Sequence, residues 1–192
     1  MKFWLYKIVR PVVKGLMKLL YRIEIVNSKS IPESGCILAG NHKNNLDCVL
    51  LMSCTQKNIR FLGKIELFKK FGWIFRNMGV IPVNRSTKNK KAVNEAEEVL
   101  KNGGIIGIFP EGTFNDTEYV LRPFKMGAVK FSYDTKVPIV PFAIVNDYKL
   151  FRKSVKIIFG KPYVVKNSDL VYENNRLMNK VIKLMKEDYE KE

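Results

Sequence analysis

Cysteine and histidine are scarce in this sequence: its 192 residues include three cysteines and one histidine. The cysteines, Cys36, Cys48 and Cys54, are odd in number and lack the close spacing of metal ligands, so neither a disulfide framework nor a zinc site is expected. Free thiols are typical of proteins in a reducing compartment. We expect a chain that needs no metal and no bound cofactor.

Long hydrophobic runs are missing as well. The most apolar uncharged stretches, residues 48–56 and 137–146, are each about half of the ~20 residues that a membrane-spanning helix requires. The N-terminal segment is positive and apolar, but charges interrupt it and no small-residue cleavage site follows, which argues against a signal peptide. We expect a chain retained at the cytoplasmic face of the cell membrane, as a peripheral or monotopic protein.

Arginine is also scarce, although the chain is strongly basic. Lysine and arginine total 34 against 18 acidic residues, which gives a net charge of +16, yet only 8 of the 34 are arginine. Basic proteins are attracted to phospholipid surfaces, nucleic acids and phosphorylated substrates. Because arginine forks are the main readers of base edges, their scarcity favours an anionic phospholipid surface over nucleic acid as the partner. Many of the lysines can equally be solvated surface residues.

Residues 2–26 have the pattern of a basic amphipathic helix. Lys7, Arg10, Lys14 and Lys18 recur at spacings of three and four, so they share one helical face. Pro11 is predicted to kink this helix or to divide it in two. Large apolar residues fall mostly on the rest of the helix surface: Phe3, Trp4, Leu5, Ile8, Val12, Leu16, Leu19 and Leu20.

Two interpretations of this segment remain open. Lysines for anionic headgroups beside aromatic residues for the acyl boundary are typical of an interfacial helix. A helix packed on its own domain, with a solvated basic side, would show the same pattern. We favour the first and expect residues 1–28 to be membrane-associating helices and residues 29–192 to be a single α/β domain.

From residue 35 onward, short apolar runs alternate with helical patterns. The predicted strands are residues 36–39, 59–62, 79–83, 105–109, 139–145 and 155–159. The predicted helices start at a Ser86 or Thr87 cap, at residue 125 and near Leu170. Two of the strands show no polar alternation, as expected of parallel strands buried on both faces. The pattern predicts an α/β fold with a mainly parallel central sheet flanked by helices.

His42 is the only histidine, and it follows a predicted strand and precedes a predicted helix. Such junctions at the carboxyl ends of strands are where α/β proteins place ligands. Imidazole suits a base that must lose and regain a proton near neutral pH. Asp47, five residues on, could orient the ring as in a hydrolase triad. A histidine that merely satisfies a turn is the plainer alternative, and a cysteine nucleophile has only the position of Cys48 beside Asp47 in its favour.

Charged residues stand at other predicted strand ends. Glu111 lies in a Pro-Glu-Gly turn directly after the strand that ends at residue 109, and Gly112 would let a ligand approach the backbone. Arg85 follows another strand, where its guanidinium could bind a phosphate or pair with a surface glutamate. Lys64 and Lys125 are further cations at element edges that carry little information singly.

Together these stretches resemble, in content and in order, the four motifs of the glycerolipid acyltransferase family, of which lysophosphatidate acyltransferase is the type member. The first motif is matched by Asn41, His42 and Asp47, and the second by Gly63, Lys64, Glu66, Leu67, Ile81, Pro82, Val83 and Arg85. The third and fourth are matched by residues 109–113 and 137–141. The resemblance covers roughly residues 30–160, and four motifs in order are far more specific than any one of them.

The resemblance implies roles for these residues. His42 would be the general base and Asp47 would orient it. Arg85 would bind the acceptor phosphate. The substrate site would be completed by Glu111, Gly112 and Thr113, with Lys64 and Lys125 assisting at the phosphate or the developing oxyanion.

Two departures from the family pattern bear on the acceptor. The third motif usually continues with Arg and Ser, but Phe114 and Asn115 follow Thr113 here. One phosphate-site cation is therefore missing, or is replaced by Arg122 or Lys125. Within the first motif, Lys43 places a cation beside the base.

The resemblance implies transfer of a fatty acyl group from an acyl thioester, carried by coenzyme A or acyl carrier protein, to the sn-2 hydroxyl of lysophosphatidate. The alternatives are a different acceptor, such as glycerol 3-phosphate or another lysolipid, and a non-catalytic basic protein that binds membranes. An esterase is less favoured because no serine elbow is present, and a nucleic-acid-binding protein because no such motif is present.

Overall fold

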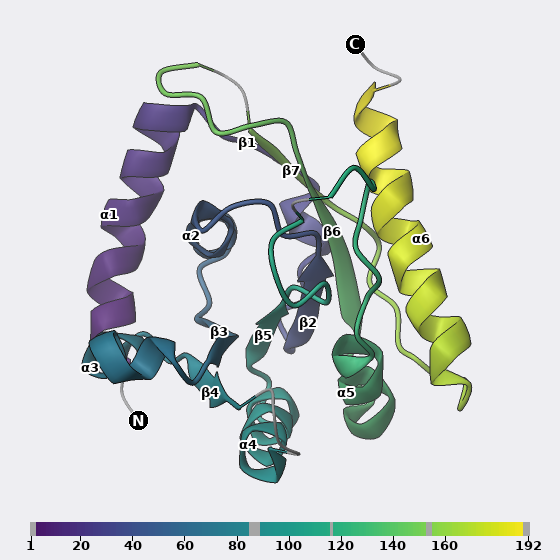
Figure 1. Cartoon of the computed structure of the whole chain (residues 1–192). Coiled ribbons are helices and arrows are strands. Elements are labelled where there is room, and N and C mark those ends of the chain that lie inside the picture. Colours follow the sequence, from purple (N-terminus) through teal and green to yellow (C-terminus); the bar gives the residue numbers. More distant parts are fainter. Residues whose placement is uncertain (1–2, 85–88, 116, 153–154, 190–192) are drawn as a thin grey trace.

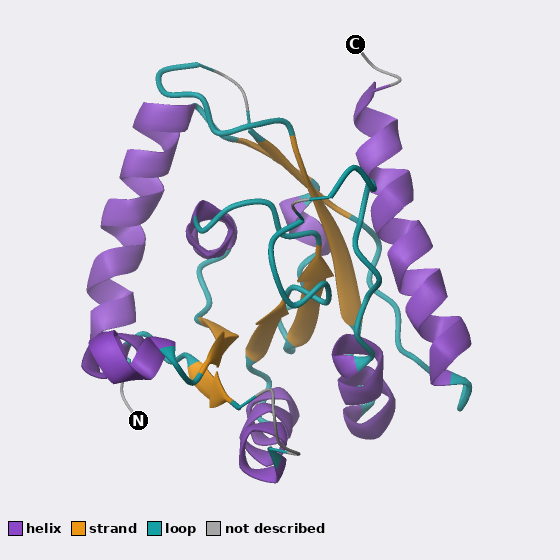
Figure 2. Ribbon diagram, viewed as in Figure 1, coloured by secondary structure: helices purple, strands orange, loops and turns teal. Residues whose placement is uncertain are grey.

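The computed structural model describes residues 3–84, 89–115, 117–152 and 155–189. Within these residues seven strands form one sheet in the order β1-β7-β6-β2-β5-β3-β4 (Figures 1 and 2). The strands are β1 (Glu24–Val26), β2 (Cys36–Gly40), β3 (Ile59–Lys64), β4 (Ile81–Val83), β5 (Ile105–Ile108), β6 (Ile139–Val145) and β7 (Lys156–Phe159). The helices are α1 (Trp4–Tyr21), α2 (Leu46–Cys54), α3 (Leu67–Asn77), α4 (Lys90–Lys101), α5 (Gly127–Thr135) and α6 (Leu170–Tyr189), with a 3-10 turn at Ser28–Ser30.

The sheet is mainly parallel, as the sequence predicted. Neighbouring strands from β6 through β2, β5 and β3 to β4 are all parallel. At the other edge β7 pairs antiparallel with β6, and β1 pairs parallel with β7. The carboxyl ends of β6, β2, β5, β3 and β4 therefore lie along one edge of the sheet, where side chains from distant parts of the chain can meet.

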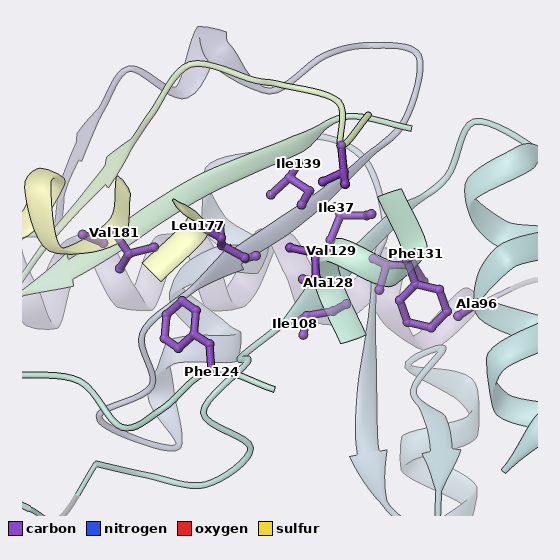
Figure 3. Close-up of a cluster of buried hydrophobic side chains, with 14 of the residues drawn as sticks. Ile37, Ala96, Ile108, Phe124, Ala128, Val129, Phe131, Ile139, Leu177 and Val181 are labelled. Atoms are coloured by element: carbon purple, nitrogen blue, oxygen red, sulfur yellow. The ribbon is translucent and has the colours of Figure 1, made fainter. Parts of the chain in front are cut away.

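Alternating strand residues fill two hydrophobic cores, one on each face of the sheet. One core joins Ile37, Ile108 and Ile139 to α4, α5 and α6 (Figure 3). The other joins Leu38 and Phe142 to α1 and α2. The result is a three-layer α/β/α arrangement, with α1 and α2 on one side of the sheet and α4, α5 and α6 on the other (Figure 1). Because both faces are covered, β5 and β6 are buried throughout, which explains their lack of polar alternation.

Some local predictions need correction. The cap of α4 is Asn89, whose side chain accepts a hydrogen bond from Ala92 N at 3.2 Å, so the prediction of Ser86 or Thr87 was wrong. Both of those residues lie outside the described part of the chain. α1 runs from Trp4 to Tyr21 as one helix that contains Pro11, instead of two short helices. β1 and α3 were not predicted.

α1 packs on the domain through one face and leaves the opposite face open. Tyr6 and Met17 are buried in the second core, and Arg10 donates to Thr55 O at 2.6 Å. The exposed face carries large apolar side chains at helical spacing: Trp4, Ile8, Val12, Leu16 and Leu19. No helix in the described residues combines the length and hydropathy needed to span a bilayer.

Candidate active site

Three of the predicted site residues lie at the carboxyl edge of the sheet. His42 follows β2, Glu111 follows β5 and Lys64 is the last residue of β3. In the sheet β5 lies between β2 and β3, so these three positions are neighbours along the edge although they are distant in sequence. Neighbouring strands are about 4.8 Å apart, so β2 and β3 lie roughly 10 Å from each other.

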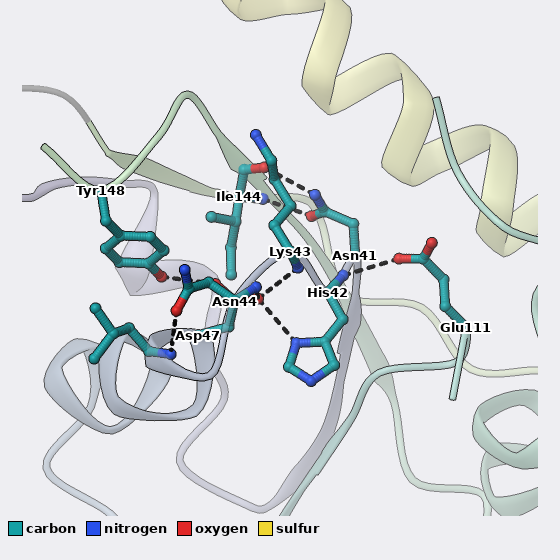
Figure 4. Close-up of polar contacts among 9 residues, drawn as sticks. Asn41, His42, Lys43, Asn44, Asp47, Glu111, Ile144 and Tyr148 are labelled. Atoms are coloured by element: carbon teal, nitrogen blue, oxygen red, sulfur yellow. Dashed lines mark hydrogen bonds and ion pairs between the residues drawn. The ribbon is translucent and has the colours of Figure 1, made fainter. Parts of the chain in front are cut away.

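Asp47 holds the His42 ring in one orientation. The carboxylate lies in the first turn of α2 and is fully buried. Its Oδ2 accepts hydrogen bonds from His42 Nδ1 at 2.9 Å, Lys43 N at 2.7 Å and Asn44 N at 2.8 Å (Figure 4). Because an ionised carboxylate only accepts hydrogen bonds, Nδ1 carries the proton and the lone pair of the neutral ring is on Nε2. The side chain of His42 is 16% exposed, so the ring is largely but not fully covered.

Asn41 fixes the chain just before His42. Its side-chain amide donates to Ile144 O at 2.8 Å and accepts from Ile144 N at 2.7 Å. This pair of bonds joins the Asn41 side chain to β6 two residues beyond Phe142, the last β6 residue that pairs with β2. The backbone that leads into His42 is therefore fixed to the edge of the sheet.

Glu111 ties two loops together from a buried position. Oε1 accepts from His42 N at 2.9 Å and Oε2 accepts from Arg122 N at 2.8 Å. Burial raises the pKa of the Glu111 carboxyl, and the two backbone donors oppose this effect in part. With both oxygens used by backbone N–H groups, Glu111 joins the backbone at His42 to the backbone at Arg122.

Two phenyl rings enclose the His42 imidazole. Phe109 stacks on it with a centroid distance of 4.0 Å and an interplanar angle of 15°, and Phe114 lies at 4.5 Å and 59°. Asn115 N donates to His42 O at 3.0 Å, which holds the neighbouring Phe114 near the His42 ring. Phe114 thus covers part of the His42 ring, at a position where the family pattern has arginine.

A polar residue that the sequence did not reveal completes this cluster. The Tyr148 hydroxyl donates to Asp47 Oδ1 at 2.7 Å (Figure 4). The two residues are 101 positions apart, so no local spacing links them. Only the fold of β6 beside β2 could have identified the contact.

Comparisons with known proteins identify the family of this chain. The acyltransferase family model matches residues 22–145. The 1-acyl-sn-glycerol-3-phosphate acyltransferase of Bacillus subtilis is 30% identical over 166 residues, which are 82% of each chain. The probable 1-acyl-sn-glycerol-3-phosphate acyltransferase of Mycoplasma pneumoniae is 31% identical over 65% of this chain and 50% of its own length.

The crystal structure of the 1-acyl-sn-glycerophosphate acyltransferase PlsC from Thermotoga maritima superimposes with a TM-score of 0.71. It is 23% identical, and the match covers 92% of this chain and 78% of that one, which supports the fold. The chain belongs to the acyltransferase family.

The remaining predicted site residues of this acyltransferase are Lys64, Gly112, Thr113, Lys125 and Arg85. Thr113 and Lys64 are exposed. Lys125 is also exposed, and its side chain passes over Gly112, where an added Cβ would lie 2.8 Å from Nζ. Gly112 has a φ of +75°, so any other residue would be strained there. Arg85 lies outside the described residues.

The cysteines of the acyltransferase are poor nucleophiles. Burial raises the pKa of each thiol, Cys36, Cys48 and Cys54, to about 12, and the neighbouring Asp47 carboxylate adds to the effect at Cys48. A thiol must ionise to attack. The position of Cys48 beside Asp47 therefore gives it no catalytic advantage.

Proposed function

We propose that this acyltransferase moves a fatty acyl group from an acyl thioester to the sn-2 hydroxyl of lysophosphatidate, which yields phosphatidate for phospholipid synthesis. The observation that carries the proposal is the His42–Asp47 pair with Nε2 available at a partly open site. Among the described residues no hydrogen bond joins a serine or cysteine side chain to His42, so the nucleophile is assigned to the substrate. The printed names of the relatives support lysophosphatidate as the acceptor.

The reaction is a direct transfer without an acyl-enzyme. His42 Nε2 removes the proton of the acceptor hydroxyl while the hydroxyl oxygen attacks the thioester carbonyl carbon. Asp47 stabilises the imidazolium that forms. The tetrahedral oxyanion then collapses, the C–S bond breaks, and the departing thiolate takes up the proton from His42. The enzyme is thereby returned to its starting state.

Phosphate recognition is assigned to three basic residues. Arg85, two residues after β4, is proposed to bind the acceptor phosphate, because an arginine fork matches phosphate oxygens. Lys125 beside Gly112 and Lys64 at the end of β3 are proposed to assist at the phosphate or at the oxyanion. Glu111, Gly112 and Thr113 are proposed to shape the acceptor site. Thr113 and Lys64 are exposed and accessible to a substrate that enters from the surface.

Residues 1–28 are proposed to hold the enzyme on the cytoplasmic face of the cell membrane, next to its lipid substrates. The exposed apolar face of α1 continues onto α3, where Trp73 is 63% exposed and lies 6.0 Å from Trp4 between ring centroids. Exposed Lys7 and Lys18 flank this surface and suit anionic headgroups. An exposed apolar surface bordered by lysines is typical of a surface that contacts lipid.

Activity is tested by acyl transfer from labelled acyl-CoA to lysophosphatidate in detergent micelles, with wild type beside His42→Ala. Product is expected from the wild type, and the variant should be roughly 10²- to 10⁴-fold slower. A His42→Ala enzyme with near-wild-type turnover would refute the base. Product only with acyl carrier protein thioesters, glycerol 3-phosphate or another lysolipid would correct the assignment of the substrates.

In the same assay, Arg85→Ala should raise the acceptor KM more than the thioester KM. Equal effects on the two KM values would contradict phosphate binding.

Membrane docking is tested by sedimentation with anionic vesicles, using Val12→Glu on α1 and Val171→Glu on α6 as a matched pair. The two valines are 58% and 56% exposed, so both variants should fold. Val12→Glu should weaken vesicle binding roughly tenfold or more, because it replaces apolar burial with a buried charge. Val171→Glu should bind as the wild type does. Equal losses, or binding to RNA as strong as to vesicles, would contradict the docking surface.

A further inference from the structure

Asp47 is held by more than the residue that it orients. In the described part of the chain, its carboxylate accepts four hydrogen bonds, three at Oδ2 and one at Oδ1. The single bond at Oδ1 comes from Tyr148, which is the one side chain besides His42 in this set. The other two donors are backbone N–H groups of the loop that His42 itself begins. Tyr148 is therefore an anchor from a different part of the fold.

In its bond to Asp47, the hydroxyl of Tyr148 is the donor. Burial and the neighbouring Asp47 carboxylate both raise the pKa of Tyr148, so its proton stays on the oxygen. Its distance of 2.7 Å to Oδ1 is that of a charge-assisted hydrogen bond. A carboxylate bound at Oδ2 alone could turn about its terminal torsion, which is a soft rotation. The bond at Oδ1 removes that freedom and keeps Oδ2 directed at His42.

The segment that carries Tyr148 is itself fixed from two sides. Its ring meets Tyr21 edge-to-face, with a centroid distance of 5.6 Å and an interplanar angle of 88°. Three residues on, Phe151 N donates to Leu20 O at 2.5 Å, which joins the segment to the end of α1. On the other side, Lys43 Nζ donates to Asn146 O at 3.1 Å. Tyr148 thus links the position of Asp47 to that of α1.

We propose that Tyr148 is a positioning residue that completes a Tyr148–Asp47–His42 chain and holds the base in its working orientation. This inference rests on the proposed role of His42. Tyr148 touches no reacting atom, and its proton does not move during transfer. The proton of the acceptor hydroxyl goes to His42 Nε2 and then to the departing thiolate, while Asp47 keeps its charge throughout.

Loss of the hydroxyl should loosen the hydrogen bond between Asp47 Oδ2 and His42 Nδ1. Without the bond at Oδ1, the Asp47 carboxylate can turn about its terminal torsion, so Oδ2 no longer faces the ring in one fixed direction. The His42 ring should then take up more than one orientation, and its ring-proton NMR signals should shift or broaden.

The test uses Tyr148→Phe with Tyr21→Phe as the matched control. Both changes remove one hydroxyl from the same edge-to-face pair, but only the first contacts Asp47. Because His42 is the only histidine, its ring protons can be followed by NMR in micelles without assignment. Tyr148→Phe should shift or broaden the ring-proton signals of His42 and lower kcat about tenfold. The two KM values should stay within about twofold, since the substrate contacts are unchanged. Tyr21→Phe should match the wild type in all three.

Three outcomes would overturn the positioning role. The first is wild-type ring-proton signals of His42 and a wild-type kcat in Tyr148→Phe. The second is an equal change in Tyr21→Phe, which would assign the effect to ring packing. The third is a lower melting temperature in Tyr148→Phe with no change in the ring-proton signals. Because the NMR measurement needs no substrate, a wild type without acyl transfer would overturn the proposed function separately, by a different readout.

Discussion

Asp47→Asn offers the sharpest test of how the base is stabilised. An asparagine oxygen at the place of Oδ2 can still accept from Lys43 N, Asn44 N and His42 Nδ1. Its amide nitrogen would then lie at the place of Oδ1, where the Tyr148 oxygen can accept instead of donate. The ring and the loop are therefore expected to keep their positions. What the substitution removes is the negative charge that faces the imidazolium during transfer.

The expected loss follows from the distance and the burial. Two unit charges about 4 Å apart attract by about 4 kcal/mol at an effective dielectric constant near 20, and this is an upper bound because Asn retains part of the dipole. Each 1.36 kcal/mol is tenfold in rate, so kcat should fall about 10²- to 10³-fold. Folding should suffer much less, since a lost carboxylate in the first turn of a helix costs about 0.3–1 kcal/mol. For a chain of this size the melting temperature should drop by roughly 1–4 °C.

The assay measures kcat with labelled acyl-CoA and lysophosphatidate for Asp47→Asn, His42→Ala and the double variant, alongside melting curves. If Asp47 acts only through His42, the double variant should be no slower than His42→Ala alone. A double variant whose loss is the product of the single losses would show that Asp47 acts independently. Retention of more than about a tenth of the wild-type kcat in a folded Asp47→Asn enzyme would refute charge stabilisation of the base.

Three further substitutions probe the surroundings of the base. Glu111→Gln replaces one of two acceptors with a donor that faces a backbone N–H, so it should destabilise the fold by about 1.5–3 kcal/mol and lower the melting temperature by roughly 3–12 °C; an unchanged melting curve would contradict the role of Glu111 in joining the two segments. Phe114→Ala removes one of the two rings on His42 and should reduce kcat/KM roughly 2- to 10-fold, whereas a gain in rate would show that the ring obstructs the acceptor. Cys48→Ala should keep near-wild-type activity, because burial raises the pKa of this thiol to about 12 and holds it un-ionised; an inactive but folded variant would reopen a thiol mechanism.

Elements that depend on local spacing could be predicted from the sequence. The interval from His42 to Asp47 spans one turn into a helix, and the hydrogen bond between them is the one that this spacing indicated. The runs that form β5 and β6 lack polar residues because helices cover both faces, and that pattern is written along each strand. α3 was not predicted, and its backbone leaves helical geometry at Phe71, with φ −129° and ψ 31°. β1 has three residues, too few to show a period.

Amino-acid order by itself determined the mainly parallel α/β architecture, the family and the His42–Asp47 pair, because each depends on residues close together along the chain. The tertiary structure alone decided what reaches that pair from elsewhere. Tyr148 meets Asp47 only because β6 lies beside β2, and Glu111 meets His42 only because β5 lies on the other side of β2. The tertiary structure also decided which face of α1 is exposed. Because Tyr6 and Met17 are buried, the row of apolar side chains that contains Ile8 faces outward. Contacts between distant residues depend on strand order, which no local pattern encodes.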